Sequence, residues 1–311
     1  MSGFLENVQG SLVALYESLQ ASALLMFTDP IQLPLDQAVL VGASALFVGA
    51  VLWTVCGGQR RNKVKLRKEF TPGKVYVHGP TPVKAIPNLT PFGMKLETYL
   101  RMADISYEPM YQMSFSGPKG KIPWIEYNGE ALGDSGLILE FLNREKGVDL
   151  NQSLSDADKA VSRAFTKMVE ENTYWGLIQE RWIDNYDKIH ELIELPWIFL
   201  FLRRSAAKDK FRQMMRAHGI GRHSKGELVG IIEKDLKAIS SFLGTKPYLM
   251  GDEPTEVDAA VFGQLSEIVW TAPDSYLHRI VTVDCPNLLA YCNRIKDRYW
   301  PDWDQLTGND A

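Results

Sequence analysis

The chain has 311 residues, of which 45% are hydrophobic and 23% are charged, and its net charge is −4 at neutral pH. A chain of this length can bury a sizeable core and has room for about two domains. The weakly negative charge argues against a nucleic-acid-binding protein, which would present a basic surface. The three cysteines, Cys56, Cys285 and Cys292, form neither a C-x-x-C motif nor a metal-ligand spacing. They predict reduced thiols and no metal site.

Charge is distributed unevenly at the start of the chain. Residues 1–58 contain four acids and no Lys or Arg, and within them residues 38–56 are nineteen residues without a charge. A helix needs about 20 apolar residues to cross a bilayer. Six bases then follow before the next acid, and basic residues flank a span on its cytosolic side. We therefore predict an exoplasmic segment at 1–37, a transmembrane helix at 38–56 and a basic juxtamembrane linker at 57–72.

Two alternatives exist for the apolar run 38–56. A cleaved signal peptide would begin with a basic region, which is missing, and the sequence Ala43-Ser44-Ala45 lies inside the run instead of after it. A buried core helix fits less well, because the basic residues begin just past the end of the run. The prediction is a single-pass protein with its large domain in the cytosol. The plasma membrane, the endoplasmic reticulum and the mitochondrial outer membrane all suit this topology.

The first predicted domain begins with a strand and a helix. Residues 75–78 are a short β-prone run, and Thr90 and Pro91 suit the cap and first position of a helix. Apolar side chains then recur at helical spacing: Phe92, Leu96, Tyr99, Leu100 and Ala103. Residues 105–111 alternate in polarity and predict a second strand.

A hairpin and a second helix complete this domain. Asn128 and Gly129 suit a type I′ turn, because both tolerate the positive φ that the turn requires. Pro123 belongs at a strand start, an edge or a cis turn, because it cannot donate a hydrogen bond to a sheet. Asp134 and Ser135 are candidate caps of the helix that follows. Strand–helix–strand followed by hairpin–helix predicts a thioredoxin-like domain over residues 73–147.

Residues 155–305 show helical periodicity and predict an all-helical domain. One apolar stripe leads into Tyr174 and Trp175. The pair Thr255 and Asp258 has the spacing of a capping box at the start of a later helix. The apolar run 196–202 is too short to span a membrane. We expect this run to be buried in the helical domain and not to lie on a bilayer.

Long motifs in both domains resemble a known family. They are residues 90–104, 120–128, 166–171, 218–222 and 248–251. Over residues 73–303 the chain resembles the failed axon connections family, the metaxin-like branch of the glutathione transferase fold. The resemblance implies a thioredoxin-like domain, a helical domain and an N-terminal membrane anchor. It also implies a role linked to axon development, with metaxin relatives acting in mitochondrial outer-membrane import.

The resemblance further implies where a glutathione site would lie. It places the thiol-facing hydroxyl at Thr90, recognition of the peptide backbone at Ile122 before Pro123, and the γ-glutamyl contacts at Asp134 and Ser135. A thiolate is favoured by a hydrogen-bond donor at a helix N-terminus. Glutathione transferases use Tyr, Ser or Cys for this task, so threonine departs from the pattern. Ordinary helix capping is the alternative role of Thr90, Asp134 and Ser135.

Several functions agree with these features. The favoured one is a membrane-anchored, non-catalytic interaction protein of the failed axon connections type, with protein partners in a homodimer or heterodimer. One alternative is a glutathione-dependent transferase acting on hydrophobic electrophiles, with Tyr174 and Trp175 near the second-substrate pocket. Another is a metaxin-like component of an organelle-membrane import system. Glutathione is the cofactor that the resemblance implies, and neither a metal nor a nucleic acid is expected.

Overall fold

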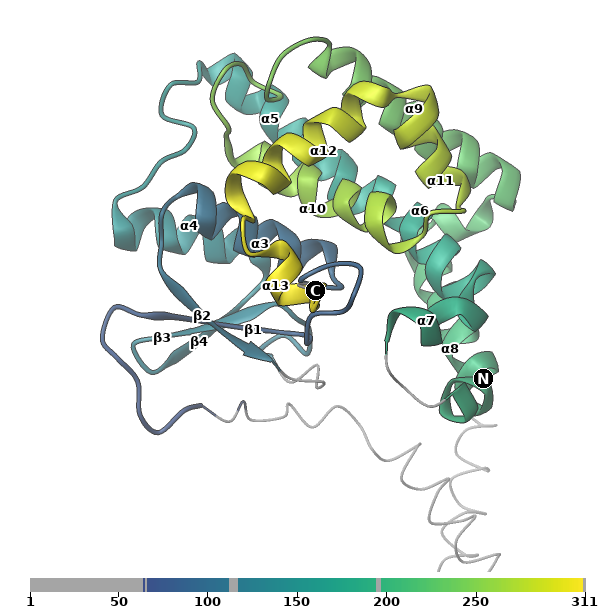
Figure 1. The fold of residues 1–311 in the computed structure, drawn as a ribbon, viewed down its shortest axis with the longest axis horizontal. Coiled ribbons are helices and arrows are strands. Elements are labelled where there is room, and N and C mark those ends of the chain that lie inside the picture. The colour runs from purple at the N-terminus through teal and green to yellow at the C-terminus, as the bar shows by residue number, and fades with distance from the viewer. Residues whose placement is uncertain (1–63, 65, 112–116, 194–196, 310–311) are drawn as a thin grey trace, which may run out of the picture. The chain divides into compact units, whose positions relative to one another are not determined.

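A four-stranded sheet forms the first domain of the computed structural model, which describes residues 64, 66–111, 117–193 and 197–309 (Figure 1). The strand order is β2-β1-β3-β4. β1 (Val75–Gly79) runs parallel to β2 (Tyr107–Tyr111) and antiparallel to β3 (Trp124–Tyr127), which pairs with β4 (Glu130–Gly133). Asn128 and Gly129, between β3 and β4, have φ values of 49° and 81°, both positive as the hairpin prediction requires.

Two helices cover one face of this sheet, as Figure 1 shows: α3 (Pro91–Met102) and α4 (Ser135–Lys146). Side chains alternate between the two faces of a strand, so every second residue of β1 and β3 points toward the helices. The resulting core joins apolar residues of the sheet and both helices, among them Val75, Val77, Leu96, Leu100, Ile125, Ile138 and Leu142. The thioredoxin-like fold predicted for this part of the chain is therefore present.

The opposite face of the sheet carries polar residues. The ring of His78 stacks on Trp124 with centroids 3.7 Å apart, and its Nε2 lies 2.8 Å from Glu126 Oε1. Burial lowers the pKa of His78, although Glu126 opposes the shift. The backbone N–H of Arg67 donates to Glu126 Oε2 at 2.9 Å. The described end of the predicted linker 57–72 therefore packs against the sheet.

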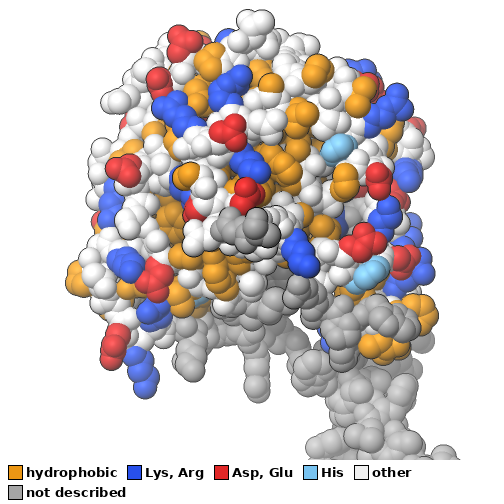
Figure 2. Space-filling view, in the orientation of Figure 1, with side chains coloured by type: hydrophobic (Ala, Val, Ile, Leu, Met, Phe, Trp, Pro, Cys, Tyr) orange, Lys and Arg blue, Asp and Glu red, His pale blue; other side chains and the backbone are white. Residues whose placement is uncertain are grey.

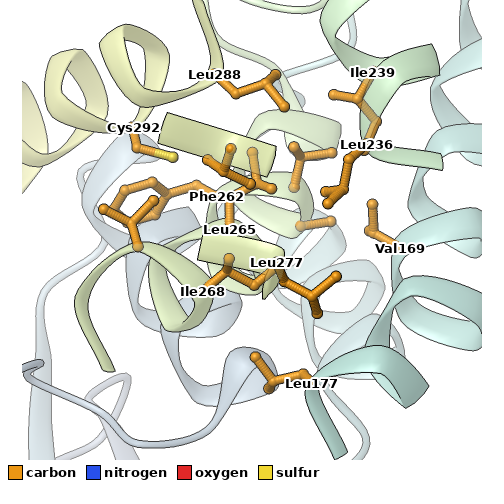
Figure 3. Packing of buried hydrophobic residues seen from close by; sticks show 14 of the residues in the cluster. Val169, Leu177, Leu236, Ile239, Phe262, Leu265, Ile268, Leu277, Leu288 and Cys292 are labelled. Carbon is orange, nitrogen blue, oxygen red and sulfur yellow. The ribbon is translucent and has the colours of Figure 1, made fainter. Parts of the chain in front are cut away.

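The second domain consists of helices, with α10 at its centre. In chain order these are α5 (Asp156–Lys167), η1 (Met168–Thr173), α6 (Tyr174–Ile178), η2 (Gln179–Asp184), η3 (Tyr186–Lys188), α7 (Ile189–Leu192), α8 (Trp197–His218), η4 (Ile220–Arg222), α9 (Lys225–Leu243), α10 (Glu256–Thr271), α11 (Tyr276–Arg279), η5 (Ile280–Asp284), α12 (Pro286–Tyr299) and α13 (Trp303–Thr307). α10 is buried over nearly its whole length. Figure 3 shows Phe262, Leu265 and Ile268 of this helix surrounded by apolar side chains of the neighbouring helices.

A buried carboxylate organises the start of α10. Asp258 is fully buried and accepts hydrogen bonds from the backbone N–H and the hydroxyl of Thr255, at 2.8 and 2.9 Å. It also accepts from the backbone N–H of Leu249 at 2.8 Å and from the hydroxyl of Tyr291 at 3.0 Å. Because these donors come from the preceding loop and from α12, Asp258 ties three parts of the helical domain together.

The two domains meet along α3 and α10. At Gly263 the helices approach so closely that an added Cβ would lie 2.4 Å from the carbonyl oxygen of Pro91. α3 also contacts the end of the chain. Arg101 makes two hydrogen bonds to Asp302, at 2.6 and 2.9 Å, and its guanidinium lies 3.9 Å from the ring centroid of Trp300. The indole N–H of Trp300 donates to Thr98 Oγ1 at 3.1 Å.

The predicted single-pass membrane topology and the localisation based on it are contradicted. No helix in the described part of the chain is both long enough and apolar enough to cross a bilayer. The longest, α8 and α9, have 22 and 19 residues but carry charged side chains along their length. The predicted segments 1–37 and 38–56 lie outside the described residues. A cytosolic domain anchored by 38–56 is therefore not retained as the localisation of this protein.

Candidate functional site

The N-terminus of α3 is where the resemblance places a thiol-facing hydroxyl. Thr90 is the N-cap of this helix, and its Oγ1 accepts a hydrogen bond from the backbone N–H of Gly93 at 2.9 Å. The same hydroxyl donates to Asn88 Oδ1 at 3.1 Å. A hydroxyl has a single proton to donate. In this conformation the Thr90 proton is committed to Asn88, so the side chain performs the capping role.

Asn88 is held firmly in the position that binds Thr90. Its side chain is 1% exposed, and its Nδ2 donates to Glu97 Oε1 at 2.7 Å. The other oxygen of Glu97 accepts from the hydroxyl of Tyr107 at 3.0 Å, and burial raises the pKa of Glu97. An added Cβ at Gly93 would come within 2.3 Å of Asn88 Oδ1, so the asparagine fills the space beside the first turn. Sequence reasoning missed this residue, although an Asn two positions before a cap is a known turn signal.

The next two predicted residues form the turn into β3. The peptide bond between Ile122 and Pro123 is cis, which is one of the alternatives expected for this proline, and Pro123 is buried. Trp124 follows as the first residue of β3 and pairs with His78 of β1. The turn is therefore fixed to the centre of the sheet.

Asp134 and Ser135 lie at the start of α4, as predicted. Asp134 is the N-cap, and its Oδ1 accepts from the backbone N–H groups of Gly136 and Leu137 at 3.0 and 3.2 Å. Its φ of 88° is unfavourable for a residue with a side chain, and such conformations cluster at functional sites. Ser135 is 6% exposed. Both residues therefore stand at a helix terminus, and Asp134 satisfies the N–H groups that an external anion would otherwise bind.

A cleft of about 360 Å³ lies beside the start of α4 and is closed on its other side by α5 and η1. Among the five predicted site residues, only Asp134 belongs to its described lining. Charges of both signs surround it, including Lys95 of α3, Arg163 of α5 and Glu170 of η1. Lys95 Nζ lies 2.5 Å from Glu170 Oε1, and both side chains are less than a tenth exposed. This ion pair connects the two domains within the lining of the cleft.

The aromatic residues predicted near a second-substrate pocket, Tyr174 and Trp175, touch edge to face with ring centroids 5.3 Å apart but have different surroundings. Tyr174 lies toward α3, with its ring 5.3 Å from that of Phe92, and burial raises its pKa to about 12. Trp175 is 9% exposed and packs into the helical core. Sequence reasoning also missed a buried ion pair close to Tyr174, in which Arg181 Nη2 donates to Glu267 of α10.

The described cysteines lie in the core of the helical domain. The described cysteines, Cys285 and Cys292, are unpaired and buried, and burial raises the pKa of Cys292. A thiol shifted in this direction stays protonated and is a poor nucleophile. Within the described ranges, His, Cys, Asp and Glu form no cluster that could hold a metal ion.

Comparison with known proteins identifies the family. Models of the glutathione S-transferase N-terminal and C-terminal domains match residues 91–188 and 232–295. The isoprene-epoxide glutathione S-transferase of Rhodococcus sp. (strain AD45) is 30% identical over 238 residues, which cover 72% of this chain and 99% of that enzyme. The chain belongs to the glutathione S-transferase family.

Within the glutathione S-transferase family, this chain falls in the metaxin-like branch. Failed axon connections of Drosophila melanogaster is 32% identical over 256 residues, which cover 77% of this chain and 61% of that protein. Metaxin-2 of Mus musculus is 26% identical over 217 residues, which cover 68% of this chain and 82% of that protein. This chain therefore spans about three fifths of the length of the Drosophila relative. The resemblance predicted from the long motifs is confirmed.

A solved structure confirms the transferase fold. The crystal structure of the beta-etherase LigF from Sphingobium sp. strain SYK-6 aligns with a TM-score of 0.54 at 15% identity. The alignment covers 76% of this chain and 99% of that one. At this identity the likeness concerns the fold alone. The roles predicted for Thr90, Ile122, Pro123, Asp134 and Ser135, and the exact domain bounds, stay predictions.

Proposed function

We propose that this chain is a non-catalytic member of the glutathione S-transferase family that acts by binding other proteins. The observation that supports this proposal is the hydrogen bond from the Thr90 hydroxyl to Asn88 Oδ1. The relative named failed axon connections makes axon development the process in which we place this role. Its partners would be proteins, bound as a homodimer or a heterodimer.

The energetics of thiol activation support the non-catalytic assignment. A free thiol has a pKa of about 8.5 and is mostly protonated at neutral pH, so a transferase must lower this value. An oriented donor contributes on the order of 2 to 4 kcal/mol to transition-state stabilisation in comparable sites. Thr90 would have to break its bond to the buried Asn88 to supply this donor. Its branched side chain also restricts the alternative rotamers.

Weak glutathione binding remains compatible with this proposal. The resemblance places the family's tripeptide contacts at the cis-Pro123 turn and at Asp134, whose φ is positive. The cleft beside Asp134 carries both bases and acids. The γ-glutamyl end of glutathione carries an ammonium and a carboxylate, so a lining of mixed charge suits it. We expect binding without appreciable turnover.

Conjugation of glutathione to a generic electrophile should proceed at the uncatalysed rate with the wild-type chain, with Thr90→Ala and with Thr90→Ser. Thr90→Ala should instead lower the free energy of unfolding by about 1 kcal/mol, because the α3 cap is lost. Thr90→Ser keeps the hydroxyl and should remain near wild-type stability. Conjugation assays and denaturant titrations of the three proteins measure both effects. A robust wild-type rate that Thr90→Ala abolishes would overturn the proposed function.

A second candidate is a glutathione transferase acting on a hydrophobic electrophile. It is favoured by the position of Tyr174, whose ring lies beside Phe92 near the N-terminus of α3. The Rhodococcus relative is named as an isoprene-epoxide transferase, which is the class of reaction this candidate would imply. The conjugation assay separates the two candidates, because the second one requires turnover.

A further inference from the structure

The beginning of α8 exposes a cluster of hydrophobic side chains. The run 196–202 was expected to be buried, but Ile198, Phe201 and Leu202 are 41%, 60% and 72% exposed. Figure 2 shows hydrophobic side chains gathered at the lower right, in the region of α7 and α8 in Figure 1. Exposed apolar side chains that gather in one place often mark an interaction site. This cluster is therefore a candidate interaction surface.

The opposite side of α8 holds the helix on the domain. Phe211 stacks on Trp182 with ring centroids 4.8 Å apart, and Met215 is 3% exposed. Residues spaced by 18 positions share the same angular position on a helix with 3.6 residues per turn. Ile198 and Arg216 have this spacing, and Leu202 and Arg212 lie within about 40° of them. These four residues define the outward face of α8.

The later part of α8 is rich in basic residues, of which Arg212 and Arg216 lie on the outward face together with Asp209. The exposed or half-exposed cations of α8 are Arg203, Arg204, Lys208, Lys210, Arg212 and Arg216, against the single acid Asp209. Arg204 pairs with Asp187 at 2.8 Å and Arg212 with Asp209 at 3.2 Å, both at exposed sites. The described carboxylates leave the other four cations without an ion pair. Ion pairs between exposed side chains contribute little to stability. The charges of Arg204 and Arg212 are therefore available to a partner, as are those of the other four cations.

We propose that the outward face of α8 binds a protein segment in which apolar residues are followed by acidic ones. This inference rests on the proposed function and names the chemistry of the partner. The face offers apolar contact at Ile198 and Leu202 and positive charge at Arg212 and Arg216. Amphipathic segments bind such helical faces through apolar anchors spaced by three or four residues, and complementary charges set their orientation.

The order of these residues favours a protein over a lipid surface. A helix that lies on a membrane separates its apolar and basic residues around its circumference, so that one side enters the bilayer. On α8 the separation runs along the axis, with the apolar pair first and the basic pair last. From Ile198 to Arg216 this face is about 27 Å long at 1.5 Å per residue. A partner helix of similar length would match both halves in one orientation.

A synthetic peptide tests the proposal with the full chain. The probe is a labelled helical peptide with leucines at i and i+4 in its first two turns and glutamates at i and i+4 in its last two. Fluorescence anisotropy should show saturable binding that weakens as salt is added. Arg212→Gln combined with Arg216→Gln should raise the Kd at least tenfold, and Leu202→Ser should raise it severalfold. Lys234→Gln, an exposed base on α9, is the matched control and should leave the Kd unchanged.

Two further probes, a basic peptide and lipid vesicles, define the results that would contradict the proposal. A peptide with lysines in place of the glutamates should not bind, and vesicles of phosphatidylcholine with phosphatidylserine should not bind through these residues. Absence of binding by the acidic peptide, or equal binding of both peptides, would overturn the proposal. Vesicle binding that Leu202→Ser and the double Arg variant abolish would replace the protein partner with a lipid surface. Neither result affects the conjugation assay, so a failure here is distinguishable from a failure of the proposed function.

Discussion

Replacing Asp258 by alanine should lower the free energy of unfolding by about 3 to 5 kcal/mol, because several buried donors would lose their acceptor together. The carboxylate is 0% exposed and accepts two backbone N–H groups and two hydroxyls. Thr255→Ala removes one hydroxyl at the same helix start and should cost about 1 kcal/mol, as the loss of a cap usually does.

Denaturant titration of the two variants and of Asp258→Asn measures this difference. Asp258→Asn keeps the shape of the side chain but replaces one acceptor oxygen with a donor, so its stability should fall between those of the other two. The spectroscopic signature of the folded state should be unchanged in Thr255→Ala. Equal midpoints for Asp258→Ala and Thr255→Ala would show that the carboxylate does not hold these donors.

Gly263→Ala should destabilise the chain by about 1 to 3 kcal/mol, the usual cost of overpacking a close contact. The new Cβ would lie 2.4 Å from the carbonyl oxygen of Pro91 and 2.9 Å from the backbone nitrogen of Lys95. Both atoms belong to the main chain of α3, so they cannot move aside as a flexible side chain would. The two domains would have to separate slightly along their shared interface.

Gly230→Ala is the matched control for this prediction. Gly230 lies inside α9, and an added Cβ there would meet no other atom within 4 Å. Replacing it by alanine should therefore stabilise the chain by up to about 1 kcal/mol, because glycine is a poor helix former. Thermal and chemical denaturation should give shifts of opposite sign for the two variants. Shifts of the same sign and size would mean that α3 and α10 are not in close contact.

Local signals in the sequence predicted much of the fold correctly. The Asn128-Gly129 turn, the Thr90 cap and the pairing of Thr255 with Asp258 each depend on residues close together in the chain. Periodicity located α3, α4 and the helical domain for the same reason. Each of these features depends on residues that are close together in the chain, so a single sequence is sufficient to predict it.

Contacts between residues that are far apart in the chain could not be predicted from local sequence patterns. Arg181 and Glu267 are 86 positions apart, and the sequence near each residue does not indicate that they form an ion pair. The hydroxyl proton of Thr90 is bound by Asn88. The sequence pattern of a helix cap does not show whether the hydroxyl proton of the capping residue is free. Periodicity also identifies apolar residues without showing whether another element covers them. The sequence therefore does not show that the start of α8 is exposed.

The contacts of α3 with Trp300 and Asp302 affect how the protein folds while it is being synthesised. Arg101 binds Asp302, and Thr98 accepts a hydrogen bond from Trp300, across sequence separations of 201 and 202 residues. On a ribosome, α3 emerges long before these partners exist. At about 5 to 20 residues per second, α3 waits on the order of 10 to 40 seconds for the residues that cover it. Its early form therefore presents an incomplete surface to chaperones, and chains that terminate just before Trp300 would keep that surface permanently.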